Sequence, residues 1–391
     1  MDYTRINLNN IFKKDDSFNT IKNTNKNQKR NYGIDLLRVF SMINIINIHV
    51  NSRAGIYFLR PNDIKFKNFW RLEAFSFCGV NCFGLISGIV GFNKYKFSNL
   101  IYLWFISSFY SVSKYLYLFF LNKINLTTLF LSFFPIITTF NWYVNAYFIM
   151  YLFLPFINYG INLLKQSTFR FLIVFYILFF SIYYIIGALF TKRSYSFLID
   201  GFSSSWLTIL YIIGSYFGKY ILESSNKTKF LHIFYYFINY IGFSLLSSEL
   251  FFITNKRVLI CYLSPTILFQ AFCLVMVFHS ININNKYIIK ILKFITPLTF
   301  SATLIHYNLF TLNVKIASYL FAFIRGFKNG FLFFKIYIIS LIIFIICIAL
   351  DYFRLLLFKF LKIKELCEFI ENFFPKALNK LFIFIKKYYY L

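Results

Sequence analysis

Apolar runs alternate with short polar stretches along almost the whole chain. A helical run of about twenty apolar residues matches the thickness of a bilayer core. The pattern therefore predicts an all-α, polytopic membrane protein with about ten transmembrane helices. The expected spans lie near residues 34–51, 72–92, 98–121, 142–164, 170–190, 205–222, 229–250, 257–279, 295–320 and 331–353.

The remaining segments divide the chain into three parts. Residues 1–32 are polar and basic and predict a disordered cytoplasmic arm without a cleavable signal sequence. Residues 33–360 form the expected transmembrane domain, in which 124–140 is short, contains Pro135 and predicts an interfacial or re-entrant segment. Residues 361–391 mix lysines with Phe, Ile and Tyr, which predicts an amphipathic helix on the inner leaflet.

Composition and charge support this assignment. The 391 residues are 59% hydrophobic and only 14% charged, which excludes a soluble domain. The net charge of +28 lies mostly in short loops and at the termini, where it indicates membrane orientation rather than binding to nucleic acid. The distribution of Lys and Arg places both termini in the cytoplasm.

Two smaller groups of residues have simple explanations. The six cysteines lack paired metal-ligand spacing, and Cys78 and Cys82 predict buried structural residues rather than a metal site. The outward loop 51–71 is unusually basic. Its cations either extend to lipid headgroups or attract an anionic acceptor, such as a lipid diphosphate-linked sugar.

The first span carries the strongest chemical signal. Arg38 and His49 are costly inside a membrane, and an ionisable residue there is a functional candidate by default. Eleven residues separate them, which places both within about 20° on one helix face and roughly 16 Å apart along it. Asp35, one turn from Arg38, is expected to orient the guanidinium, and Asn47 lies in the same polar stretch as His49.

A histidine in such a position is suited to proton transfer. A neutral imidazole can take the proton of a hydroxyl while that oxygen attacks an activated carbonyl, which is general-base catalysis of acyl transfer. His306 is a second histidine within an apolar run, with a functional or a structural role open to it. The carboxylates are few and do not recur with histidine at ligand spacing, so we expect no metal.

The arginine suggests the acyl donor. Coenzyme A carries phosphates at one end and its thioester at the end of a long flexible arm. Arg38 at the cytoplasmic entrance could therefore hold phosphate while the thioester reaches His49. Alternatively, Arg38 is an ordinary cytoplasmic anchor.

These residues also resemble a known family. The chain is similar to the membrane-bound acyltransferase-3 family, whose members typically move acetyl groups from acetyl-coenzyme A to cell-envelope carbohydrate. The resemblance covers nearly the whole membrane domain. The matching motifs are Gly33 to Arg38 with His49 following, Gly79 to Gly88 ending in Ser-Gly, Asn141-Trp142-Tyr143, Ser264-Pro265 and His306-Tyr307.

The resemblance implies roles for individual residues. His49 would be the catalytic base, and Arg38 would take part in catalysis by positioning the donor. Ser87 and Gly88 would shape the donor site, although small residues also serve close helix packing. Lys94 and Lys96 stand where many relatives have an arginine-rich segment and would contact donor phosphate. Asp35, Asn47, Trp142 and His306 would give substrate or structural support.

The sequence thus predicts an enzyme of the bacterial cytoplasmic (inner) membrane that transfers acetyl from acetyl-coenzyme A to a hydroxyl of a cell-envelope glycan. Its expected partners are acetyl-coenzyme A, membrane lipids and a glycan, free or lipid-linked. One rival is a flippase or exporter of lipid-linked polysaccharide. Another is a membrane glycosyltransferase with Asp63 or Glu73 as its base.

Overall fold

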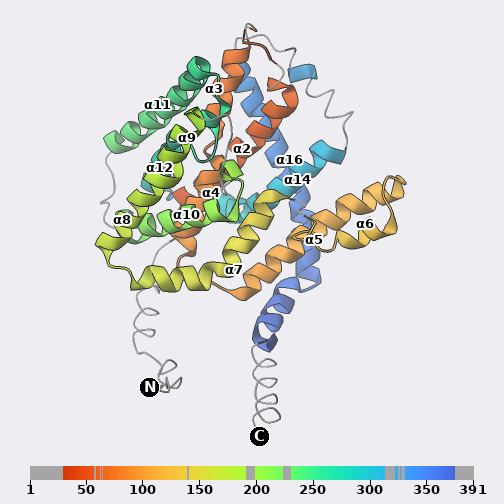
Figure 1. Ribbon diagram of the computed structural model, residues 1–391. Helices are drawn as coiled ribbons and strands as arrows, with labels where there is room; N and C mark the ends of the chain where they lie inside the picture. Colours follow the sequence, from red (N-terminus) through yellow and green to blue (C-terminus); the bar gives the residue numbers. More distant parts are fainter. Residues whose placement is uncertain are drawn as a thin grey trace, which may run out of the picture.

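The structure is a computed structural model, and it describes residues 30–56, 59–61, 63, 65–138, 141–190, 199–222, 230–312, 322–324, 326 and 331–374. Within these ranges the regular structure is helical and no strand occurs (Figure 1). The predicted all-α membrane fold is thereby confirmed. The helices are α2 (Tyr32–Ala54), α3 (Phe66–Ser76), α4 (Gly79–Gly91), α5 (Phe97–Phe120), α6 (Leu126–Leu131), α7 (Trp142–Leu163), α8 (Gln166–Ile177), α9 (Tyr184–Phe190), α10 (Ser204–Tyr216), α11 (Phe230–Thr254), α12 (Pro265–Ser280), α13 (Lys286–Ile295), α14 (Thr299–Leu312) and α16 (Leu332–Phe360).

Several helices continue through tighter or wider turns. A π-helical stretch, Leu178–Tyr183, joins α8 to α9, and another, Phe217–Ile221, extends α10. A 3₁₀ turn, Thr296–Leu298, joins α13 to α14. Short 3₁₀ turns at Ile199–Gly201 and Arg257–Ile260 precede α10 and α12. The helices joined directly by such turns form longer rods.

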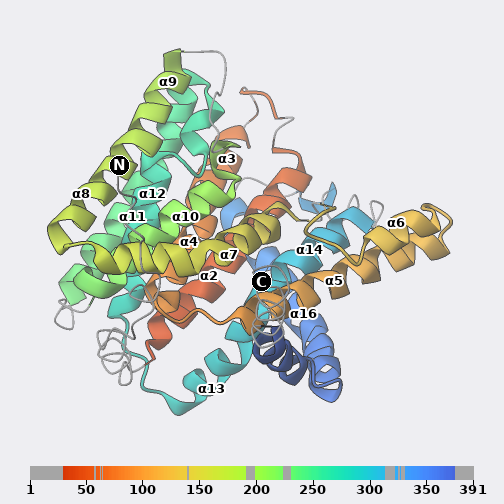
Figure 2. The same cartoon turned by 60° about the horizontal axis from the view of Figure 1, so that its bottom comes forward.

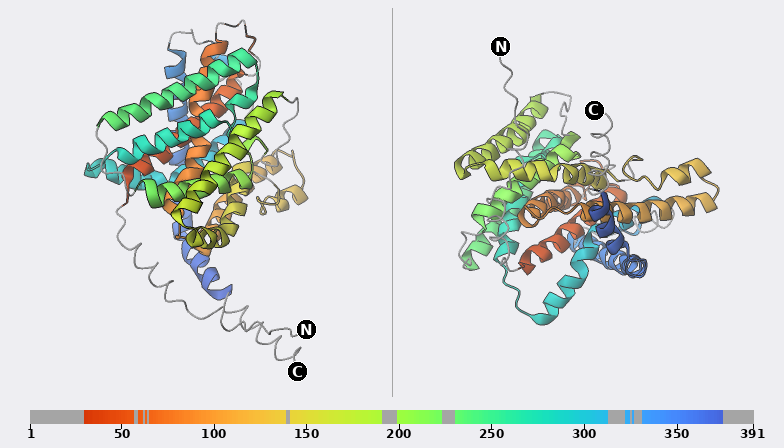
Figure 3. Two further views of the ribbon diagram at one scale, coloured as in Figure 1. Left: turned by 60° about the vertical axis from the view of Figure 1, so that its left-hand side comes forward. Right: turned by 90° about the horizontal axis from the view of Figure 1, so that it is seen from below.

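Helix α2 lies inside the bundle. Helices α3, α4, α12, α14 and α16 all pack against it, as Figures 1 and 2 show from two directions. Further out, α10 covers α4 and α11 covers α12 (Figure 3). The helix that carries Arg38 and His49 is therefore the central element of the fold.

Both ends of α2 are fixed by local interactions. Asn31 caps its start, because its side-chain oxygen accepts hydrogen bonds from the backbone N–H groups of Gly33 and Ile34. The Asn31 amide also donates to the His279 carbonyl oxygen at 3.1 Å, which ties α2 to the end of α12. Gly55 ends the helix with φ 90°, a conformation that glycine adopts without strain.

Helices α4 and α10 approach each other through glycines. A Cβ atom on Gly88 would lie 2.1 Å from the Tyr211 carbonyl oxygen, and one on Gly214 would lie 2.1 Å from the Leu85 carbonyl oxygen. Neither position has room for a side chain. The backbones of the two helices are therefore in direct contact, as small residues permit in membrane proteins.

The outer surface is apolar, as a bilayer requires. Large hydrophobic side chains are exposed along α7, α8, α11 and α16, where Phe156, Phe171, Phe234 and Phe353 are examples. Among the described residues, seven helical rods are long and apolar enough to cross a membrane. The predicted count of about ten is not confirmed. The other three expected spans correspond to α5, to α10 with its π-helical turn, and to α12, which has 16 residues.

Other expectations concern the segments outside the bundle core. Segment 124–140 contains only the six-residue helix α6 and turns, up to residue 138. Most of the basic arm 1–32 and the end of the tail 361–391 lie outside the described residues. The described part of the tail is helical over 363–374, and Glu371 accepts a hydrogen bond from the backbone N–H of Phe97 at 2.7 Å. All six cysteines are free and buried, and they include Cys78 and Cys82, for which burial was predicted.

The glycine contact between α4 and α10 gives a stability prediction. Gly88→Ala should lower the melting temperature of the purified protein in detergent, because overpacking a tight contact costs about 1–3 kcal/mol. Gly160→Ala on α7 is the matched control, since a Cβ atom there meets nothing within 4 Å. Equal melting temperatures for the two variants would contradict the close approach of these helices.

Candidate active site

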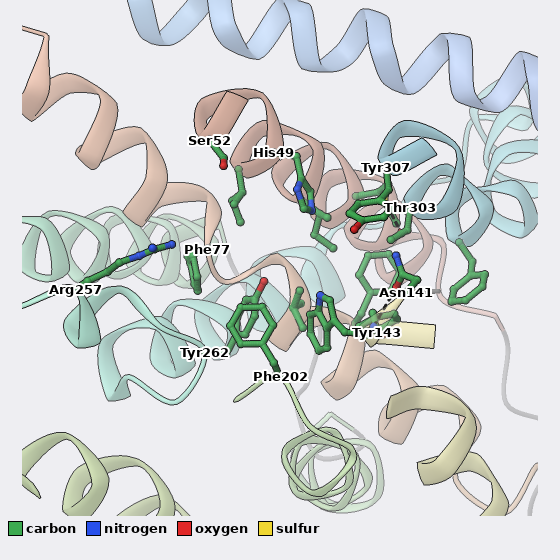
Figure 4. Close-up of a pocket in the computed structure, with 17 residues that line it drawn as sticks. His49, Ser52, Phe77, Asn141, Tyr143, Phe202, Arg257, Tyr262, Thr303 and Tyr307 are labelled. Atoms are coloured by element: carbon green, nitrogen blue, oxygen red, sulfur yellow. Dashed lines mark hydrogen bonds between the residues drawn. The ribbon is translucent and has the colours of Figure 1, made fainter. Parts of the chain in front are cut away.

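The side chain of His49 faces a cavity of about 380 Å³ near the end of α2. In Figure 4 it points into this space between Ser52 and Tyr307, and Phe202 and Tyr262 lie on the opposite side. About half of the lining side chains are aromatic, and Arg257 is the cationic one. The lining residues are Met42, Ile45, Ile48, His49, Ser52, Phe77, Val80, Phe83, Asn141, Trp142, Tyr143, Phe202, Arg257, Tyr262, Phe300, Thr303 and Tyr307.

Aromatic side chains form one wall of the His49 cavity. The ring of Trp142 lies 4.7 Å from that of Phe202 and 5.9 Å from that of Tyr262, centroid to centroid. The backbone of Tyr262 is anchored by Asn81, whose amide donates to the Tyr262 carbonyl oxygen at 2.9 Å. Trp206 in turn donates to Asn81 at 3.1 Å. Trp142, which the sequence proposed as a support residue, thus contributes to a fixed aromatic wall.

His306 lies directly beside His49. The two imidazole ring centroids are 5.0 Å apart, and the Tyr307 ring is 6.5 Å from that of His49. His306 is fully buried, and its Nδ1 lies 2.6 Å from the Ala302 carbonyl oxygen one turn earlier in α14. With Nδ1 as the donor, this bond fixes the ring orientation and leaves Nε2 as the nitrogen without a proton. His306 is therefore placed to hold the position of His49.

The other polar residues of α2 connect helices. The Asn47 amide donates to Ser76 on α3 at 2.6 Å, and its oxygen accepts from Ser340 on α16 at 3.2 Å. Asn44 accepts a hydrogen bond from the Tyr337 hydroxyl. The exposed fraction of Asn47 is 0%, so it holds the walls together rather than facing the cavity.

Arg38 borders a second, basic cavity near the start of α2. This space of about 530 Å³ is lined by Arg30, Asn31, Ile34, Asp35, Arg38, Ile89, Val90, Lys94, Gly218, Leu222 and His279. Asp35, only 3% exposed, accepts from Arg30 Nε at 2.6 Å and from an Arg38 terminal nitrogen at 3.2 Å. The lining thus holds one carboxylate and three cations, of which Asp35 pairs with two, and this positive balance suits an anion.

A third cavity shares lining residues with each of the first two. It has a volume of about 350 Å³ and is lined by Arg38, Phe83, Ile86, Ser87, Asn99, Tyr102, Leu103, Ile106, Tyr143, Tyr147, Tyr151, Thr296, Pro297, Thr299 and Phe300. Arg38 is shared with the basic cavity. Phe83, Tyr143 and Phe300 are shared with the His49 cavity. We call these three residues the neck; together the cavities make an interrupted path from Arg38 to His49.

A buried ion pair supports the wall of the third cavity. On α16, Arg354 contacts both carboxylate oxygens of Asp351 at 2.7 Å. Asp351 also accepts from the Tyr110 hydroxyl at 2.5 Å, and Arg354 donates to the Tyr102 hydroxyl at 3.1 Å. Tyr102 lines the cavity. The pair therefore fixes α5 against α16 beside the path.

The remaining residues that the sequence proposed for donor binding differ in position. Ser87 lines the third cavity, and its hydroxyl donates to the Phe83 carbonyl oxygen at 2.8 Å. Lys94 lines the basic cavity. Gly88 lies instead in the contact between α4 and α10, so helix packing accounts for it. Lys96 borders none of the three cavities; its backbone carbonyl accepts from the Tyr151 hydroxyl at 3.1 Å.

Several lining residues had not been singled out from the sequence. Arg30 precedes the first span, and His279 lies near the end of α12, yet both reach the basic cavity. Phe83 and Phe300 reach the neck from α4 and α14. Tyr143 stands in a quoted motif, but nothing in the sequence marks it apart from its neighbours. Among the described residues, no group of three or more His, Cys, Asp or Glu side chains is arranged to hold a metal.

This arrangement defines a class: a multi-pass membrane protein with an anion-attracting cavity and a histidine cavity, each of which shares lining residues with a third cavity inside the helical bundle. The chain matches the family described as "Acyltransferase domain" (Acyl_transf_3) over residues 31–351 and belongs to this family of membrane-bound acyltransferases. No curated protein and no solved structure matched the chain. Membership favours the acyltransferase over the two rivals considered from the sequence.

The positions of the cavities can be tested by thiol labelling. All six native cysteines are buried, so new cysteines should react above a low background. Ser52→Cys in the His49 cavity and Lys94→Cys in the basic cavity should react with a membrane-impermeant maleimide from opposite sides of the membrane. With the predicted orientation, Ser52→Cys reacts in intact cells and Lys94→Cys in inverted vesicles. Labelling of both from one side would contradict this arrangement.

Proposed function

We propose that this protein is an O-acyltransferase of the bacterial cytoplasmic membrane that transfers acetyl from acetyl-coenzyme A to a hydroxyl group of a cell-envelope glycan. The single observation that carries the proposal is the junction at the neck. The third cavity, which borders Arg38, and the cavity that borders His49 share Phe83, Tyr143 and Phe300. A long donor held at one end can therefore present its other end to the histidine.

The basic cavity suits the phosphates of coenzyme A. Arg30, Arg38 and Lys94 supply cations there, and Asp35 restrains both arginines so that they remain at the cavity wall. The distance along α2 from Arg38 to His49 is about 16 Å, which suits a pantetheine arm. Ser87 and Tyr147 lie along the path that this arm would take. Lys96 borders none of these cavities and is better placed to attract the donor than to hold it.

The cavity around His49 suits a sugar acceptor. Trp142, Phe202, Tyr262 and Tyr307 offer flat aromatic faces, on which the C–H faces of sugars stack. Arg257 adds a cation to the same lining. Because this cavity lies at the far end of α2 from Arg38, the glycan would enter from the outer side or from the membrane. Both termini would then lie in the cytoplasm, in accord with the distribution of basic residues.

The reaction follows from these positions. His49 accepts the proton of the acceptor hydroxyl while that oxygen forms a bond to the thioester carbonyl carbon. The carbonyl oxygen becomes negatively charged for the lifetime of the tetrahedral intermediate. The carbon–sulfur bond then breaks, the acetyl ester remains on the glycan, and the proton on His49 passes to the departing thiolate. His306 keeps the base in place during both proton transfers.

The base can be tested directly. His49→Ala should reduce acetyl transfer about 10²- to 10⁴-fold, because positioned general bases contribute rate factors of this size. Release of free coenzyme A thiol by purified protein in nanodiscs measures the rate, and mass spectrometry of surface glycan shows loss of the acetyl mass. His232→Ala, at an exposed position on α11, is the control. Transfer at the native rate by His49→Ala would refute the assignment.

The donor cavity predicts a different kinetic signature. Arg38→Gln should raise the KM for acetyl-coenzyme A about 10- to 100-fold, since hydrogen bonds to charged groups are worth about 1.5–3 kcal/mol. S-acetylpantetheine, which lacks the nucleotide phosphates, should be used equally well by the variant and the wild type. Arg170→Gln, exposed on α8, controls for loss of a cation elsewhere. An equal loss with both donors would argue against phosphate recognition by Arg38.

A further inference from the structure

Tyr143 has an unusual position at the neck. It lines both the His49 cavity and the cavity that leads to Arg38. It lies in the first turn of α7, where the Asn141 side chain accepts from the backbone N–H groups of Tyr143 and Val144 at 3.0 and 3.3 Å. This cap fixes the start of the helix. The ring is thereby held at the boundary between the two spaces.

The other neck rings surround Tyr143. Its ring centroid lies 6.5 Å from that of Phe83 and 6.4 Å from that of Phe300. The next turn of α7 supplies Tyr147, whose ring is 6.1 Å away and nearly parallel. Neither Phe83 nor Phe300 carries a polar side-chain atom. The hydroxyl of Tyr143 is therefore the only polar side-chain group that the three neck residues provide.

This hydroxyl lacks the partner that buried tyrosines usually have. Tyr143 is 7% exposed, and no hydrogen bond of its hydroxyl occurs within the part of the chain that the structure describes. Other buried tyrosines differ: Tyr211 donates to Asn158 at 2.7 Å, and Tyr240 donates to the Phe75 carbonyl oxygen at 2.8 Å. The Tyr143 side chain lines two cavities, so its hydroxyl can meet a ligand in that space. A ligand that offers an acceptor there would supply the partner that the protein does not.

The path of the donor identifies that acceptor. A thioester that extends from the Arg38 cavity toward His49 must pass between Phe83, Tyr143 and Phe300. We propose, on the basis of the function proposed above, that the Tyr143 hydroxyl donates a hydrogen bond to the thioester carbonyl oxygen and is a catalytic residue. The other two neck side chains offer no donor. The bond from Tyr143 strengthens because negative charge develops on the carbonyl oxygen in the transition state.

With this hydrogen bond, each electron pair and each proton in the acyl transfer is accounted for. As the acceptor oxygen bonds to the carbonyl carbon, the electron pair of the carbonyl double bond moves to the carbonyl oxygen, which Tyr143 stabilises without giving up its proton. When the carbon–sulfur bond breaks, the pair returns and re-forms the double bond. His49 alone carries the acceptor proton, which it passes to the coenzyme A thiolate. Tyr143 thus acts as an electrophilic group and His49 as the base.

Tyr143→Phe is the decisive variant, because it removes the hydroxyl and keeps the neck ring. We expect kcat for acetyl transfer to fall about 10²- to 10³-fold, the usual effect of removing one oxyanion donor, with little change in the KM for acetyl-coenzyme A. Tyr159→Phe is the matched control, since Tyr159 lies on the same helix and is exposed. Unchanged melting temperature and donor binding would show that the neck remains folded in the Tyr143→Phe variant.

The outcomes separate this inference from the function on which it rests. A wild-type protein that releases no thiol from any acyl-coenzyme A overturns both. A wild type that transfers acetyl, together with a Tyr143→Phe protein of native kcat, overturns only the role of Tyr143. A loss confined to KM also overturns it and assigns the hydroxyl to donor binding. A loss confined to kcat, absent in Tyr159→Phe, supports it.

Discussion

The structure depends on one constraint: polar groups within the membrane must be satisfied by the protein itself. Helix α2 carries several such groups, and Asn44, Asn47 and Asn51 are hydrogen-bonded to neighbouring helices. Asn47 joins α3 and α16, Asp35 joins Arg30 and Arg38, and Asn31 joins α2 to the end of α12. These bonds give α2 a single position in the bundle. The bundle is thus assembled around a helix that carries several buried polar side chains.

The same constraint explains why the catalytic candidates can be rigid. His306 is fixed by the Ala302 carbonyl oxygen and lies against His49, while Arg38 is restrained by a carboxylate that is itself buried. The contact at Gly88 and Gly214 holds α4, and with it Phe83, close to α10. His49, Arg38 and Phe83 are therefore all positioned by contacts with other residues inside the bundle rather than by solvent-exposed loops.

The parts of this arrangement that lie on a single helix are predictable from the sequence. The apolar runs give the helical membrane fold, and the spacing of Arg38 and His49 along one helix gives the two ends of the path. Residues that meet only through packing are not predictable in this way. Phe83, Tyr143 and Phe300 come from α4, α7 and α14, and their shared boundary depends on how three helices cross. Likewise, Gly88 matches a donor-site motif, yet its position is explained by the backbone of α10. The expected number of spans exceeds the seven rods that satisfy length and hydropathy; the other three are α5, α10 with its π-helical turn, and α12, which has 16 residues.

The neck reconciles two demands that conflict in a membrane enzyme of this kind. The phosphates of the proposed donor would need a wet, cationic site, whereas its activated thioester would need a site from which water is kept away. A single open cavity along α2 would connect the two environments and would also weaken the barrier between the two sides of the bundle. Aromatic rings instead form the boundary between the third cavity, which borders Arg38, and the histidine cavity, so this boundary is made of side chains. A slender arm can displace side chains at modest cost, whereas moving packed helices is expensive. The boundary between the two cavities is accordingly lined by side chains that could close around a thioester.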